Sequence, residues 1–303
     1  MTVSCRRAGV ICRHSTEALA GLLGVTGQWS EGSELPPMWH LVHLLDAWPQ
    51  ADMGVDGHSS QGVPSPPAPG SRRMFAGGRT WHLARLRIGE PAVRTTTVTG
   101  TAVKHGRRGD LTFVTVRHQI FQRRSVAIVE EQDIVYRAAE PDGSPPLPGT
   151  AGRPIDPGTA PGGMAFDVDP TVLFRFSALT YNAHRIHYDH GYAACEGYSD
   201  LVVHGPLHVI LMAERLRLLG RSLVGLGFSY RLTAPAIGPQ RLTVRAAGTR
   251  AEVRAGNGTV VARGELGEQE VSVSHHRAAL TFTDADCLTA PTEAVLIDLP
   301  GMT

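Results

Sequence analysis

The stretch HGPLHVILMAERLRLLG, residues 204–220, gives the clearest indication of the fold, because it predicts the helix against which other elements must pack. Apolar side chains occupy most turns of a helix drawn through it, Pro206 is near the helix start, and Gly220 marks its end. A helix that is apolar on most of its turns belongs inside a fold and not on its surface. The sequence therefore predicts a long buried helix in the second half of the chain.

Long segments rich in β-branched residues flank this helix in the sequence. Their partial alternation of polar and apolar residues, with Gly, Pro or charged residues between them, is typical of an antiparallel meander long enough to wrap another element. In the first half, four such strands are predicted at residues 80–88, 92–103, 111–121 and 125–136. In the second half, strands are predicted near residues 224–233, 240–247, 250–255 and 258–266.

Weaker signals divide the chain into units. N-cap residues, prolines and apolar spacing predict helices at residues 15–24, 38–48 and about 170–180. Residues 49–71 are rich in Gly, Pro and Ser and are expected to form a loop. The predicted organisation is an N-terminal tail (1–14), a first unit (15–138), a linker (139–165), a second unit (166–270) and a C-terminal extension (271–303).

One local match indicates that the two units are related. RLRIGEPAVRTTTVTG (85–100) and RLTAPAIGPQRLTVRAAG (231–248) both run from a strand through a Pro/Gly bend into a second strand that ends at glycine. The match favours two sheet-plus-helix units of the α+β class in tandem over one large sheet.

Composition excludes several classes of function. The 303 residues carry 29 basic and 28 acidic side chains, a net charge of +1, so no bulk attraction to nucleic acid or to a membrane surface is expected. No apolar run approaches the roughly 18 residues that span a bilayer. Cys5, Cys12, Cys195 and Cys287 form no CxxC pair, which favours a reducing compartment.

Familiar catalytic motifs are missing. The sequence has no GxSxG elbow, no GxGxxG after a strand, and only one lysine, Lys104, which is not part of a phosphate-binding loop. Nucleotide hydrolysis, hydride transfer and esterase chemistry of the α/β-hydrolase type therefore lack their usual residues.

The chemistry is concentrated in TYNAHRIHYDHGY, residues 180–192, and three interpretations compete. In the first, a metal ion is bound by His184, His187, Asp189 and His190. In the second, these residues form a polar loop without chemistry. Against the metal, Asn182 and Gly191 are poor helix formers, so the segment is expected to turn between two helices.

The third interpretation is an acid/base site. Histidine is the side chain that ordinarily titrates near neutral pH, so His187 is a candidate for proton transfer, and Asn182 can hold a water molecule or a hydroxyl group beside it. Gly205, in VVHGPL, is at a predicted helix start, where unpaired N–H groups stabilise a carbonyl that becomes an enolate. A reacting thioester needs this combination of an oxyanion site and a proton-transfer group.

These residues resemble a known family. FRFSALTYNAHRIHYDHGYA and EGYSDLVVHGPL, within 172–207, resemble the MaoC-like, R-specific hydratase and dehydratase branch of the hotdog superfamily. The resemblance narrows to the type-2 3-hydroxyacyl-thioester dehydratases and mesaconyl-C4-CoA hydratases. LPPMWHLVHLL, RRMFAGGRTWHLARLRIGEP and the strands that follow resemble the N-terminal unit of that subgroup, so that about residues 15–265 are covered.

The resemblance implies a double hotdog, in which two helix-plus-sheet units pair within one chain. It also implies reversible hydration of 2-enoyl thioesters of coenzyme A or an acyl carrier protein, with no metal or redox cofactor. The resemblance does not specify the acyl group, and branched or dicarboxylic groups such as mesaconyl are among the candidates. The chain is expected in the cytoplasm, or in the mitochondrial matrix if eukaryotic, as a monomeric pseudo-dimer or a homodimer.

The resemblance also assigns roles to residues. His187, Asn182 and Gly205 are expected to be catalytic, and the expected substrate contacts are His184, Arg185, Tyr181, Tyr188, His204 and Pro206. The broader motif Asp-x-Asn-Pro-x-His has an aspartate where this chain has Asn182, and an amide cannot act as a base. We therefore assign both proton steps to His187 as a hypothesis. The alternatives are a hotdog acyl-thioesterase and a catalytically silent acyl-binding partner.

Overall fold

Two half-sheets build the protein, and the computed structural model describes residues 4–68, 70–106, 109–138, 150–151, 163–268 and 271. The strands of the N-terminal half are β1 (Ser4–Val10), β2 (Arg72–His82), β3 (Pro91–Gly106), β4 (Gly109–Gln122) and β5 (Ser125–Arg137). Those of the C-terminal half are β7 (Gly163–Val168), β8 (Gly227–Leu232), β10 (Gln240–Ala247), β11 (Arg250–Arg254) and β12 (Val260–Gly267). A separate parallel pair is formed by β6 (Thr150–Ala151) and β9 (Ala236–Ile237).

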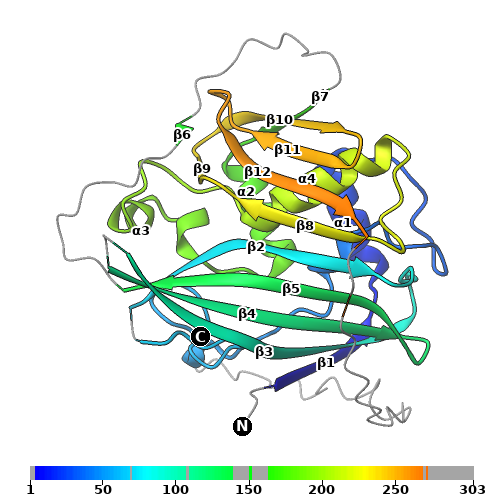
Figure 1. The fold of residues 1–303 in the computed structure, drawn as a ribbon, viewed down its shortest axis with the longest axis horizontal. Coiled ribbons are helices and arrows are strands. Elements are labelled where there is room, and N and C mark those ends of the chain that lie inside the picture. Colours follow the sequence, from blue (N-terminus) through cyan, green and yellow to red (C-terminus); the bar gives the residue numbers. More distant parts are fainter. Residues whose placement is uncertain are drawn as a thin grey trace, which may run out of the picture. The chain divides into compact units, whose positions relative to one another are not determined.

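The two half-sheets have the same topology. The strand order is β1-β3-β4-β5-β2 in one half and β7-β10-β11-β12-β8 in the other (Figure 1). Taken in sequence order, the five strands of one half therefore occupy the same places in the sheet as the five strands of the other. The segments 85–100 and 231–248 hold equivalent places, since they lead from β2 into β3 and from β8 into β10. The tandem duplication is confirmed as a double hotdog. The half-sheets are nevertheless continuous, because β2 pairs with β8 in antiparallel register to give ten strands.

The C-terminal half is built around α4 (Gly205–Leu218). The helix buries side chains at nine of its fourteen positions and packs against β10, β11, β12 and β2, as expected from its apolar sequence (Figure 1). Its buried carboxylate, Glu214, is paired with Arg217 one turn later, so burial of this charge is compensated. The predicted helix at 170–180 is confirmed as α2 (Pro170–Thr180), which is capped by Asp169.

The predicted helix at 38–48 is wrong. The chain forms only a short 3-10 turn, η1 (Trp39–Val42), and continues in extended conformation at His43. Trp39, His40, Val42 and His43 are all buried. Nearly consecutive buried side chains suit an irregular segment enclosed by the core better than an amphipathic helix with one covered face. Among the described residues of the N-terminal half, no long helix is equivalent to α4.

Two further expectations in the first half are corrected. The predicted tail contains β1, which pairs with β3, and helix α1 (Arg13–Leu23) begins before the predicted residue 15. The predicted strand 80–88 is displaced to β2, and β2 pairs with β5 and β8, so the meander has three strands and not four. Residues 83–88 leave the sheet because Leu86 and Ile88 turn into the core.

Parts of the predicted organisation cannot be compared with the structure. Most of the linker 139–165 and all of the extension 271–303 except Val271 lie outside the described residues. The strands predicted after α4 are confirmed within a few residues, and β7 is additional. Within the described residues, none of the helices has the length and apolar character required to span a membrane.

Candidate active site

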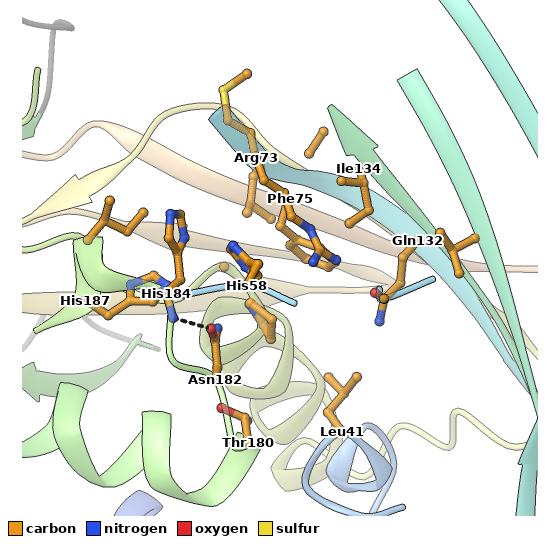
Figure 2. Close-up of a pocket in the computed structure, with 18 of the residues that line it drawn as sticks. Leu41, His58, Arg73, Phe75, Gln132, Ile134, Thr180, Asn182, His184 and His187 are labelled. Carbon is orange, nitrogen blue, oxygen red and sulfur yellow. Dashed lines mark hydrogen bonds between the residues drawn. The ribbon is translucent and has the colours of Figure 1, made fainter. Parts of the chain in front are cut away.

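A cavity of about 710 Å3 lies between the two halves, beside the start of α4. The C-terminal half lines it with the histidine loop, defined as residues 180–192, and with the first turn of α4. The N-terminal half lines it with strands β2, β4 and β5 and with the loop before β2 (Figure 2). Residues from both halves therefore face the same bound molecule.

His187 has the geometry of a proton-transfer group. It ends the 3-10 turn η3 (Arg185–His187), and its Nδ1 lies 2.7 Å from the carbonyl oxygen of Val202. Since a carbonyl only accepts, Nδ1 carries the proton, and Nε2 keeps its lone pair at the cavity. Burial, followed by the neighbouring rings of His204 and His184, lowers the pKa of His187 well below 6.5. The residue is thus a neutral base at pH 7.

Asn182 presents donors to the cavity. Its Oδ1 accepts a hydrogen bond of 3.0 Å from the backbone N–H of His184, which fixes the turn that follows α2. The side-chain NH2 group has no partner among the described residues, and Asn182 lines the cavity near His184 and His187 (Figure 2). An amide held in this way can donate to the oxygen of a water molecule or a hydroxyl group.

Gly205 is the first residue of α4 and lines the cavity. Its N–H is at the helix terminus, where no acceptor exists within the helix, and no backbone carbonyl of the described residues accepts from it. A Cβ atom at this position would lie 2.5 Å from Leu232 Cδ2 and 2.8 Å from Phe75 Cδ1. Packing of β2 and β8 against the helix start therefore requires glycine here.

Three other residues of the predicted site surround His187 in different ways. Pro206 lines the cavity, and so does His184, which is buried with its Nε2 3.8 Å from Glu196 Oε1. His204 does not line the cavity. It stacks on His187 with ring centroids 3.6 Å apart, and its Nε2 lies 2.8 Å from Ser177 Oγ. His204 thus supports the His187 ring from behind.

The remaining predicted contacts are peripheral. Arg185 does not line the cavity: its guanidinium is 2.6 Å from Asp189 and lies over the Tyr192 ring. Tyr188 is also outside the lining and donates to the carbonyl of Ala183. Tyr181 is in the lining but is 64% exposed. The geometry gives no support to substrate contacts by Arg185 or Tyr188.

The residues of the metal interpretation do not converge. Asp189 caps α3 (His190–Cys195) and pairs with Arg185, while His190 is exposed and faces Asp200. Among the described residues, a different group, Asp56, His58 and His184, offers three ligand atoms within 4.8 Å of one another. In that group, however, Asp56 already accepts a 3.0 Å hydrogen bond from Nδ1 of His58.

The pair belongs to residues 54–58, here called the Gly57 loop, which lies within the predicted loop 49–71; its contacts with the histidine loop were not predicted. Its carbonyls at Val55 and Asp56 accept hydrogen bonds from the side chain and the backbone N–H of Arg185. The ring of His58 packs on that of His184 with centroids 4.3 Å apart. The loop was expected to be irregular, and its DGH sequence carries no known catalytic motif, so only the fold reveals the contact.

Charged residues of the N-terminal half were also missed. Arg73 on β2 lines the cavity (Figure 2). Glu130 on β5 also lines the cavity; its carboxylate accepts a 3.0 Å hydrogen bond from the hydroxyl group of Tyr230 and lies 3.3 Å from His40 Nε2. Burial alone would raise the pKa of Glu130, but the hydrogen bond and charge of His40 and the charge of His118 bring it to about 2. These residues are scattered over the sequence, so no spacing could have indicated them.

A double hotdog that places a neutral histidine and a free helix N-terminus around one cavity defines a class, the acyl-thioester hydratases and dehydratases. The model of the family "Hydroxyacyl-thioester dehydratase type 2" matches residues 38–238, and the chain belongs to this family. It is a hydro-lyase that acts on acyl thioesters. The family resemblance read from the histidine loop is thereby confirmed.

Comparison with individual proteins agrees. Mesaconyl-C(4)-CoA hydratase of Chloroflexus aurantiacus is 44% identical over 249 residues, which cover 78% of this chain and 84% of that protein. The mitochondrial hydroxyacyl-thioester dehydratase type 2 of Schizosaccharomyces pombe is 26% identical over 238 residues, 70% of this chain and 77% of its own.

Solved structures show the same fold at low sequence identity. HtdX of Mycobacterium tuberculosis superposes with a TM-score of 0.60 at 13% identity, over 89% of this chain and all of its own. A second M. tuberculosis protein with a double hotdog fold gives 0.53 at 15% identity, over 88% and 94%.

Proposed function

We propose that this protein catalyses the reversible addition of water to the double bond of a short 2-enoyl-CoA that carries a free carboxylate, as in a mesaconyl thioester. The observation that carries the chemistry is the His187–Val202 hydrogen bond, because it fixes the tautomer that leaves a basic Nε2 at the cavity. The 44% identity to a mesaconyl-C(4)-CoA hydratase supports the acyl group.

The proposed reaction needs one acid/base residue. Nε2 of His187 removes a proton from a water molecule held by the amide of Asn182, and the water oxygen bonds to the β-carbon. The π electrons of the double bond move through the α-carbon to the thioester oxygen, which accepts from the N–H of Gly205. The carbonyl re-forms as the α-carbon takes the proton from Nε2, so water is added and His187 is regenerated. Dehydration follows the reverse path.

The other parts of the proposal follow from this scheme. Neither proton step calls for a metal ion or a redox cofactor. One chain supplies both hotdog units, so a monomeric pseudo-dimer contains a whole site and a homodimer would contain two. A cytoplasmic location fits the free thiols of Cys5, Cys12 and Cys195, the cysteines among the described residues.

The test is a hydration assay with mesaconyl-C4-CoA, followed by the loss of the enoyl-thioester absorbance. His187→Ala should lower kcat by about 100-fold or more, the usual contribution of a positioned acid/base group. His190→Ala, an exposed histidine of the same loop, is the matched control and should retain activity. A His187→Ala enzyme with most of its rate would contradict the assignment, and release of free thiol without hydration would indicate a thioesterase.

A further inference from the structure

Arg73 differs from the other cation of the cavity. Arg94 also lines the cavity, but its guanidinium is paired with Asp46 at 2.6 Å. No hydrogen bond or ion pair involves the guanidinium of Arg73 among the described residues. Among the described residues that line the cavity, Arg94 is therefore a paired cation and Arg73 a cation without a hydrogen-bonded or ionic partner.

The surroundings of Arg73 do not neutralise it. Figure 2 shows its side chain extending into the cavity from β2, with His58 on one side and Gln132 on the other. Neighbouring walls are apolar and include Phe75, Ile134 and Leu232. A half-buried guanidinium beside apolar surface gives up hydration without gaining a protein partner, which favours an anionic ligand.

His58 does not neutralise Arg73, because its ring carries no negative charge, and it does not attract an anionic ligand by a positive charge of its own. Its Nδ1 donates to Asp56, whose Oδ1 also accepts from the backbone N–H of His58. Burial, and next the positive charge of Arg73, lower the pKa of His58 to about 3, so the ring is neutral at pH 7. His58 lines the cavity together with Arg73, and its ring lies 4.3 Å from that of His184.

Arg73 of β2 and His187 of the histidine loop both line this one cavity (Figure 2). A carboxylate is the acyl substituent that a guanidinium recognises, through two parallel hydrogen bonds. We infer that Arg73 is the receptor for a carboxylate on the acyl group and sets the preference for dicarboxylic over monocarboxylic acyl thioesters. This inference rests on the proposed function, and it assigns acyl selection to the N-terminal half and proton transfer to the C-terminal half.

Binding of two saturated thioesters, which have no double bond to hydrate, tests it without catalysis; fresh succinyl-CoA is used because it hydrolyses slowly in water. Succinyl-CoA and butyryl-CoA differ in that a carboxylate replaces a methyl group, and titration calorimetry gives their dissociation constants. The wild-type protein should bind succinyl-CoA at least about 30-fold more tightly, a ratio of the size expected for a charge-assisted hydrogen-bonded pair. Arg73→Met should bring the ratio to within threefold of one, and Arg73→Lys should leave an intermediate value.

The matched control is Arg231→Met, an exposed arginine on β8 that does not line the cavity and should preserve the ratio. Equal binding of the two ligands by the wild-type protein, or an unchanged ratio in Arg73→Met, would overturn the inference. Hydration of mesaconyl-C4-CoA and of 3-methylcrotonyl-CoA is then compared. If neither of these enoyl thioesters is hydrated but the preference for succinyl-CoA is observed, the proposed function is wrong and the assignment of Arg73 as the carboxylate receptor is retained.

Discussion

Gly57 lies directly against the carbonyl of Ala183: a Cβ atom at Gly57 would be 1.8 Å from that oxygen. The contact joins the Gly57 loop of the N-terminal half to the histidine loop of the C-terminal half. Gly57 also has φ +88, a left-handed conformation that favours glycine. The two loops that form the cavity wall beside His184 therefore depend on a residue without a side chain.

Gly57→Ala should separate these loops. We expect the free energy of unfolding to fall by about 2–3 kcal/mol, from left-handed strain together with overpacking, and kcat/KM to fall at least tenfold. Denaturant unfolding and the hydration assay give both values. Gly258→Ala is the matched control, since Gly258 has φ +86 but open space around it, and it should show the strain alone with normal activity. Equal effects of the two variants would refute a role for the contact.

Gly205→Ala should damage the start of α4. The added Cβ would collide with Leu232 and Phe75, so we expect a loss of about 1–3 kcal/mol in stability and a lower kcat. Leu232→Ala in the same chain removes the nearer contact atom and should restore part of the stability. If the double variant recovers stability and remains slow, the position of the α4 N–H matters for catalysis. Full recovery of kcat would mean that packing alone explains the glycine.

Asn182→Asp should change the pH dependence more than the fold. A carboxylate oxygen can still accept from the N–H of His184, so the turn is retained. The added negative charge would stabilise the imidazolium of His187 and raise its pKa. Because the neutral form is the base, the acid limb of kcat/KM should move to higher pH. A profile that coincides with that of the wild-type enzyme would contradict a place for Asn182 beside His187.

The protein should lose stability as the pH falls below about 6.5. Burial is the main cause of lowered pKa values at seven histidines, namely His43, His58, His82, His118, His187, His204 and His208. Below pH 6.5, the ordinary pKa of histidine, the unfolded chain binds protons at these residues, whereas the folded chain excludes them until the pH reaches the lowered pKa of each residue. Stability is therefore present above 6.5 and lost on acidification, by up to about 1.4 kcal/mol per pH unit for each histidine.

One substitution isolates a single contribution to this acid sensitivity. His208 is buried on α4, and burial lowers its pKa to about 4. His208→Gln should reduce the slope of unfolding free energy against pH between 6.5 and 4, whereas His190→Gln, at an exposed site, should not. Chemical denaturation at several pH values measures the slopes. Identical slopes for both variants would show that His208 is protonated in the folded protein.

Local patterns in the sequence predicted the main helices and most strands of the C-terminal half. The apolar run at 204–220 predicts α4 because burial on most turns leaves a direct record in the residues. The helix predicted at about 170–180 is equally local, since the cap that the structure shows at Asp169 bonds to an N–H group a few residues away. The histidine loop was recognised from its spacing, and the structure places Asn182, His187 and Gly205 around one cavity.

Tertiary structure decided what depends on contacts between distant residues. The segment 38–48 has helical spacing, yet burial from several directions leaves only a single turn, and no local pattern records that burial. The place of β2 beside β8, the stacking of His204 on His187 and the exclusion of Arg185 from the cavity each arise from packing between separate elements. The sequence alone determined the family, the duplicated units and the position of the histidine loop. Only the fold places Arg73 and the Gly57 loop around the same cavity as the histidine loop. The physical reason is that a cavity lined by both halves exists only once the two half-sheets have paired.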